Sequence, residues 1–150
     1  MNESRPGLVL DTNVVLDWLV FGDARVRRIA AAIDEGAVRL VTSPACFEEL
    51  QRALGYSAIK LDAAGQAQAC RRYLATAEFL DVPAAGGTLP ACEDRDDQKF
   101  LDLAWHAGAR WLVSRDRALL KLANQVAKLG RFSVLAPDEL ESALSRTRPQ

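Results

Sequence analysis

The chain has 150 residues, of which 49% are hydrophobic and 26% are charged, a balance that is typical of globular proteins and excludes an intrinsically disordered one. Its formal net charge of -1 argues against a protein that coats nucleic acid with a uniformly basic surface, but leaves room for a local basic rim. Cys46, Cys70 and Cys92 form no C-x-x-C pair, which argues against a disulfide framework or a zinc site. The first residues lack a signal-peptide pattern and no apolar run could span a bilayer, so we expect a cytoplasmic protein with no membrane partner.

Strands and helices are predicted to alternate through the first half of the chain. The apolar run 8–10 predicts a buried parallel strand, followed by helices over about 14–21 and 24–35. Residues 38–42 predict a second strand, after which Ser43-Pro44 has the chemistry of a helix start. Asp62 can cap a long alanine-rich helix that continues to about residue 77.

The same alternation continues in the second half. A third strand is expected at 79–82, then a loop at 83–90 that contains Gly86-Gly87, and then an acid-rich helix start at 93–97. A strand at 111–114, a helix from 117 to about 129 capped by Asp116, a strand at 132–135 and a helix opened by Pro137 complete the chain. This order predicts an α/β fold with a parallel sheet and helices on both faces. We expect a single domain over residues 1–150, with a frayed tail over about 145–150.

Four acidic side chains are placed to meet at one edge of this sheet. Asp11 and Asp116 follow the carboxyl ends of the first and fourth strands, the edge where open α/β sheets bind ligands. Helical spacing puts Glu49 at the border of an apolar face, with Glu48 pointing to solvent, and puts Asp97 on the inward face of its helix. Each residue taken alone also fits a helix cap, a favourable charge at a helix start or a surface charge, so the prediction depends on the set.

Such a set of carboxylates predicts a divalent metal site. Four carboxylates in one cleft would repel each other and raise each other's pKa unless a cation lay between them, and all-oxygen ligation favours Mg²⁺ or Mn²⁺ over zinc. A metal ion of this kind supports phosphodiester cleavage without a side-chain nucleophile. Asn13, Ser114, Asp94 and Asp96 are candidate supporting residues.

The ordered motifs resemble the PIN-domain family, in particular the toxin-like (VapC-type) ribonucleases of prokaryotic toxin–antitoxin systems. The similar segments are 8–14, 42–54, 94–101, 112–120 and 133–140. The resemblance implies a three-layer α/β/α sandwich with a five-stranded parallel sheet and Mg²⁺- or Mn²⁺-dependent endoribonuclease activity. It also implies a homodimer and a cognate antitoxin protein.

The resemblance places the catalytic acids of the family at Asp11, Glu49, Asp97 and Asp116. On this interpretation Asp11, Asp97 and Asp116 hold the metal ion, while Glu49 completes the site or positions the attacking water. Basic side chains near these acids are candidates for binding the RNA backbone, and they are Arg52, Arg95, Lys99, Arg115 and Arg117.

Two alternatives remain open at this point. One is a Mg²⁺-binding receiver-like signalling domain, for which Asp81 lies near the phosphoacceptor position but the expected lysine after the fifth strand is missing. The other is a catalytically inactive PIN module that only binds RNA or protein, against which the complete set of four acids argues.

Overall fold

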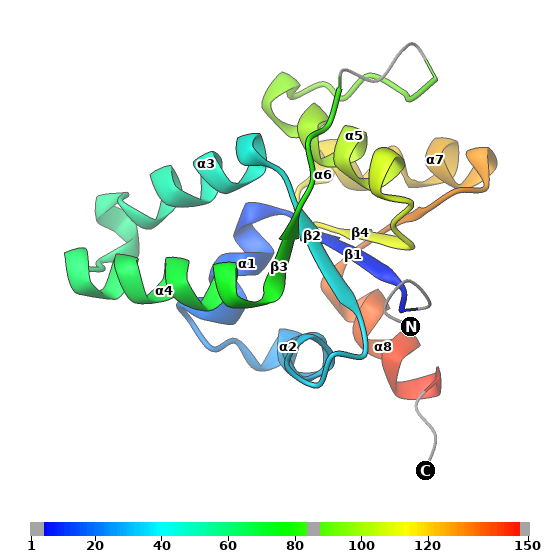
Figure 1. Cartoon of the computed structure of the whole chain (residues 1–150). Coiled ribbons are helices and arrows are strands. Elements are labelled where there is room, and N and C mark those ends of the chain that lie inside the picture. The colour runs from blue at the N-terminus through cyan, green and yellow to red at the C-terminus, as the bar shows by residue number, and fades with distance from the viewer. Residues whose placement is uncertain (1–4, 84–87, 148–150) are drawn as a thin grey trace.

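The computed structural model describes residues 5–83 and 88–147, in which strands alternate with helices (Figure 1). The strands are β1 Gly7–Leu10, β2 Arg39–Thr42, β3 Ala77–Phe79, β4 Trp111–Val113 and β5 Ser133–Leu135. The α-helices are α1 Thr12–Leu19, α2 Arg27–Asp34, α3 Pro44–Leu54, α4 Ala63–Thr76, α5 Gln98–Ala107, α6 Arg117–Leu120, α7 Ala123–Leu129 and α8 Pro137–Thr147. Three 3₁₀ turns, η2 Ala24–Val26, η3 Ser57–Ile59 and η4 Arg95–Asp97, complete the described elements. None of the helices in these two ranges is long and apolar enough to cross a membrane.

The five strands form one parallel sheet in the order β3-β2-β1-β4-β5, with β1 at its centre. Leu8 of β1 pairs with Leu40 of β2 on one side and with Trp111 of β4 on the other. Because every strand is parallel, all five carboxyl ends lie at the same edge of the sheet. Receiver-like domains have the strand order 2-1-3-4-5, so the observed order excludes the signalling-domain alternative.

Helices cover both faces of the sheet, which confirms the predicted three-layer α/β/α fold (Figure 1). Leu8 and Leu10 of β1 belong to a buried cluster with residues of α1, α2, α3, α4 and α8. Val9, between them, belongs to a second buried cluster that includes residues of α5, α6 and α7. This alternation follows from the two-residue period of a strand, because successive side chains point to opposite faces.

Three helices begin at the caps that the sequence predicted. The Ser43 hydroxyl accepts a hydrogen bond from the Cys46 amide at 3.3 Å, with Pro44 as the first residue of α3. Asp62 accepts from the Gly65 amide at 2.8 Å, and Asp116 accepts from the Ala118 amide at 2.9 Å. Each cap satisfies a backbone N–H that has no partner within its helix. The caps at Ser43 and Asp116 also fix where the chain leaves the carboxyl edge of the sheet.

Some element boundaries differ from the prediction. Strand β3 occupies Ala77–Phe79 instead of 79–82, because it pairs in register with Leu40, Val41 and Thr42 of β2. The helix expected over 117–129 is divided into α6 and α7. Helix α8 continues through 145–147, where the sequence led us to expect the start of a frayed tail. Residues 148–150, and the Gly86-Gly87 part of the expected loop, lie outside the described residues.

Candidate active site

Asp11 and Asp116 lie at the carboxyl edge of the sheet and are joined through Ser114. Asp11 follows β1 and is only 3% exposed, and its amide donates a hydrogen bond to the Val113 carbonyl of β4 at 2.9 Å. The hydroxyl of the buried Ser114 donates to Asp11 Oδ2 at 2.6 Å and accepts from the Asp116 amide at 2.9 Å. One serine therefore sets the position of a carboxylate on β1 relative to the loop after β4.

Asp94, Asp97 and Asp116 form the tightest group of acidic side chains among the described residues. Each offers a carboxylate oxygen, and these oxygens all lie within 4.8 Å of one another. Asp94 caps the 3₁₀ turn η4 by accepting from the Asp96 amide at 3.0 Å, and this turn places Asp97 at the start of α5. The 3₁₀ turn thus brings the carboxylates of Asp94 and Asp97 to the side of the turn that faces Asp116.

Asp97 is the least solvated member of this group. It is 6% exposed, and its buried Oδ2 atom has no hydrogen-bond partner. Burial raises the pKa of Asp97 to about 8, helped by a hydrogen bond with the Asp116 carboxyl and by the negative charges of Asp11, Asp116 and Asp94. A carboxyl group in this environment carries a proton at neutral pH unless a cation replaces that proton.

Asp11 experiences the same environment. Burial raises the pKa of Asp11, and the charges of Glu49 and Asp116 add to this effect, whereas the hydrogen bond from Ser114 opposes it. Asp11, at the carboxyl edge of the sheet, therefore lies near enough to interact electrostatically with each of the other predicted acids, Glu49, Asp97 and Asp116. Asp94, which the sequence suggested only as a supporting residue, lies in the tightest group with Asp97 and Asp116.

Glu49 is held in place by two neighbours. It is half-buried on α3, while Glu48 beside it is exposed, as helical spacing predicted. The Thr12 hydroxyl donates to Glu49 Oε2 at 2.5 Å, and the Lys99 ammonium pairs with Glu49 Oε1 at 2.5 Å. Sequence reasoning did not select Thr12, although its place directly after Asp11 at the end of a buried strand was a signal for it.

Two of the suggested supporting residues do not join the site. Asn13 is exposed on α1, and within the described part of the chain its side chain makes no hydrogen bond to Asp11. The Asp96 side chain is also exposed and lies outside the group formed by Asp94, Asp97 and Asp116. The backbone of Asp96 contributes instead, because its carbonyl accepts a hydrogen bond from Lys99.

The five basic residues suggested for RNA binding divide into two kinds. Arg115 makes a bidentate pair with the buried Asp17, with distances of 2.9 and 3.2 Å, and Lys99 is engaged by Glu49. Arg52, Arg95 and Arg117 are exposed and form no ion pair within residues 5–83 and 88–147. These three guanidinium groups are therefore available to an external anion.

The structure thus gathers carboxylate oxygens, the ligands that hard divalent cations prefer, at the carboxyl edge of a parallel α/β sheet. The sequence profile of the PIN domain family matches residues 7–118, and the chain belongs to this family. PIN domains are generally nucleases and typically bind a divalent metal ion.

A solved structure has the same fold. The crystal structure of PAE2754 from Pyrobaculum aerophilum superposes with a TM-score of 0.62 and covers 98% of this chain and 100% of its own chain. The two sequences are 16% identical, so this similarity concerns the fold alone. No curated protein matches the chain significantly.

Proposed function

We propose that the protein is an endoribonuclease that hydrolyses RNA phosphodiester bonds with the help of Mg²⁺ or Mn²⁺. The observation that carries this proposal is the set of three carboxylates, from Asp94, Asp97 and Asp116, whose oxygens lie within 4.8 Å of one another. Membership of the PIN domain family supports the same proposal, because PIN domains are generally nucleases.

The side chains fit a hard divalent cation. The donors are all oxygens, which Mg²⁺ and Mn²⁺ prefer to nitrogen or sulfur. The buried Oδ2 of Asp97 has no partner, and a buried polar atom without a partner is costly unless a ligand satisfies it. We propose that Asp94, Asp97 and Asp116 hold the ion, and that Asp11 adds a fourth carboxylate from its position beside Ser114.

When bound, the metal ion would lower the pKa of water and neutralise the charge that develops on the phosphate. Glu49 lies at the rim of the same site, and its carboxylate can still accept a hydrogen bond from water because each oxygen has two lone pairs. Thr12 and Lys99 fix the orientation of Glu49, so we assign it the positioning of the attacking water. Hydrolysis joins the water oxygen to phosphorus and releases the 3′ oxygen as a hydroxyl group.

We assign RNA backbone binding to Arg52, Arg95 and Arg117. Their exposed guanidinium groups would contact phosphates, and the resulting affinity would decrease steeply as salt rises. We do not assign RNA backbone binding to Arg115 and Lys99, because their charges are already paired with Asp17 and Glu49, respectively.

We further propose that the enzyme is the toxin of a toxin–antitoxin system and acts in the cytoplasm as a homodimer. Three unpaired cysteines, Cys46, Cys70 and Cys92, suit a reducing compartment. A neighbouring small reading frame for a DNA-binding protein that forms a stable complex with this chain would support the toxin role, and light scattering would test the dimer.

The enzyme proposal is tested with a circular single-stranded RNA, which only an endonuclease can open. We expect cleavage with Mn²⁺ and none with chelator, and we expect Asp11→Asn to abolish it. Asp96→Asn is the matched control, since the Asp96 side chain is exposed and outside the acidic group. Cleavage without a metal ion would contradict the proposal. If the wild type never cleaves RNA and the Asp11→Asn protein still binds RNA in full, the alternative of a binding module is favoured.

A further inference from the structure

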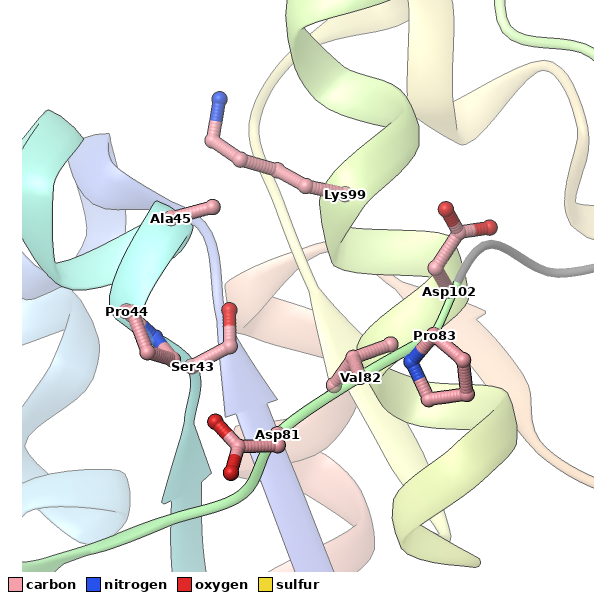
Figure 2. Close-up of a pocket in the computed structure, with 8 residues that line it drawn as sticks. All are labelled: Ser43, Pro44, Ala45, Asp81, Val82, Pro83, Lys99 and Asp102. Carbon is pink, nitrogen blue, oxygen red and sulfur yellow. The ribbon is translucent and has the colours of Figure 1, made fainter.

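A cavity of about 560 Å³ lies beside the candidate active site, beyond the carboxyl ends of β2 and β3. It opens between the start of α3, the segment that follows β3, and α5 (Figure 2). This volume is within the range of about 300–1,000 Å³ that is usual for small-molecule sites. Lys99 connects the cavity to the acids, because its side chain lines the cavity while its ammonium group pairs with Glu49.

The walls of the cavity suit a flat, partly apolar group. Pro44 and Ala45 of α3 lie on one side, and Val82 and Pro83 lie on the other (Figure 2). Apolar side chains on both sides can contact the two faces of a planar ring and exclude water from it. A nucleobase has this shape, and sequence-specific proteins bind single-stranded RNA mainly through unstacked bases.

The polar groups of the cavity select the chemistry of its occupant. Asp81 and Asp102 supply carboxylates, which only accept hydrogen bonds when ionised, and Ser43 supplies a hydroxyl group. Among the described residues that line the cavity, Lys99 supplies the ammonium group, and this group is engaged by Glu49 and by the Asp96 carbonyl. The cavity would therefore repel a phosphate and attract a neutral group that carries several N–H donors.

Resting on the proposed ribonuclease function, we infer that this cavity binds one base of the RNA next to the cleaved bond and that Asp81 and Asp102 select guanine. Guanine is the base whose Watson–Crick edge presents two adjacent donors, N1–H and the N2 amino group, to one carboxylate. Adenine and cytosine present a single amino group, and uracil presents a single N–H. Asp102 is the stronger candidate of the two, since it is half-buried in the wall and Asp81 is exposed.

Cleavage mapping gives the first test. RNA oligonucleotides that differ at a single position, carrying G, A, C or U, are incubated with the protein and Mn²⁺, and the ends are mapped. We expect cleavage beside G to exceed cleavage beside the other bases by about tenfold or more, the discrimination that one bidentate contact provides. Asp102→Asn and Asp81→Asn should each reduce this preference, whereas the control Asp34→Asn, an exposed residue at the end of α2, should keep it.

A binding measurement separates this inference from the proposed function. Titration calorimetry with the four nucleoside 5′-monophosphates in the presence of chelator measures the affinity for each base in the absence of catalysis and of metal ions. We expect GMP to bind more tightly than AMP, CMP and UMP, and Asp102→Asn to remove the difference. Equal affinities for all four, or a GMP preference that survives both substitutions, overturns the inference even if the protein cleaves RNA. A GMP preference in a protein that cleaves no RNA supports the cavity and contradicts the ribonuclease proposal.

Discussion

Ser114 and Asp11 lie 103 positions apart in the sequence, yet the Ser114 hydroxyl donates a hydrogen bond of 2.6 Å to the Asp11 carboxylate. The same hydroxyl accepts the Asp116 amide at 2.9 Å. Ser114 is completely buried, so solvent does not reach the hydroxyl group that makes both hydrogen bonds. A neutral side chain therefore fixes the spacing between two of the acidic residues, and its removal should affect stability and metal binding together.

Ser114→Ala should destabilise the fold by about 1–3 kcal/mol, because it leaves the Asp116 amide without its partner and removes a donor from the buried Asp11. It should also weaken Mn²⁺ binding, since Asp11 and Asp116 lose their common anchor. Urea unfolding and a Mn²⁺ titration measure the two effects. Ser133→Ala, at an exposed position of β5, is the control and should change neither.

Glu49→Gln should lower the cleavage rate by about 100-fold or more, if Glu49 positions the attacking water as proposed. Glu48→Gln is a close control, because it makes the same chemical change one residue away on an exposed side chain. Initial rates on the circular RNA compare the two variants. Equal rates would contradict the role assigned to Glu49.

The metal-free protein should become less stable as the pH rises from about 4 to about 8. Asp97 has a pKa of about 8 in the folded protein and an ordinary value of 3.8, so between these values the folded state binds more protons than the unfolded state. Stability then falls with increasing pH, by at most about 1.4 kcal/mol per pH unit from this one group. Urea unfolding in chelator at pH 5, 6, 7 and 8 measures the slope.

Asp97→Asn supplies the comparison for that slope, because the amide imitates the protonated carboxyl and does not titrate. The difference between wild type and Asp97→Asn should grow with pH, and an identical slope in both would contradict the assignment. Mn²⁺ should displace the proton from wild-type Asp97, so its affinity should increase with pH up to about 8.

Arg115→Ala should lower the free energy of unfolding by more than it weakens the free energy of RNA binding. Its guanidinium group holds the buried Asp17 with two hydrogen bonds, and loss of such a partner leaves a carboxylate unpaired at a cost of about 1–3 kcal/mol. Arg117→Ala should have the opposite profile, with unchanged unfolding and weaker, less salt-dependent RNA binding. Unfolding curves and binding at several salt concentrations distinguish the two arginines.

The order of strands and helices was predictable from the sequence because it depends on local patterns. Apolar runs marked the strands, and the caps at Ser43, Asp62 and Asp116 marked helix starts within a residue. The exact place of β3 was not predictable, since it is set by pairing with β2 across the sheet. The division between α6 and α7 was also not predictable, because the apolar pattern continues through Leu119, Leu122 and Val126.

The gathering of acids at the sheet edge was predictable because parallel strands end on the same side. Helical spacing also predicted the inward position of Asp97, but not that Asp94 lies in the same group, since the 3₁₀ turn η4 replaces the first helical turn and changes the angular spacing. The place of Asp102 in the cavity wall beside Lys99 was not predictable either, because it depends on the segment after β3 lying against that side of α5.

The acidic residues come from distant parts of the chain, and the last of them, Asp116, follows β4, which pairs between β1 and β5. During synthesis, Asp11 leaves the ribosome about a hundred residues before its partners Ser114 and Asp116. A growing polypeptide that ends before β4 therefore has only part of the acid set. For an enzyme that attacks RNA, as proposed, this order of synthesis delays destructive activity until the segment that follows β4 has been made.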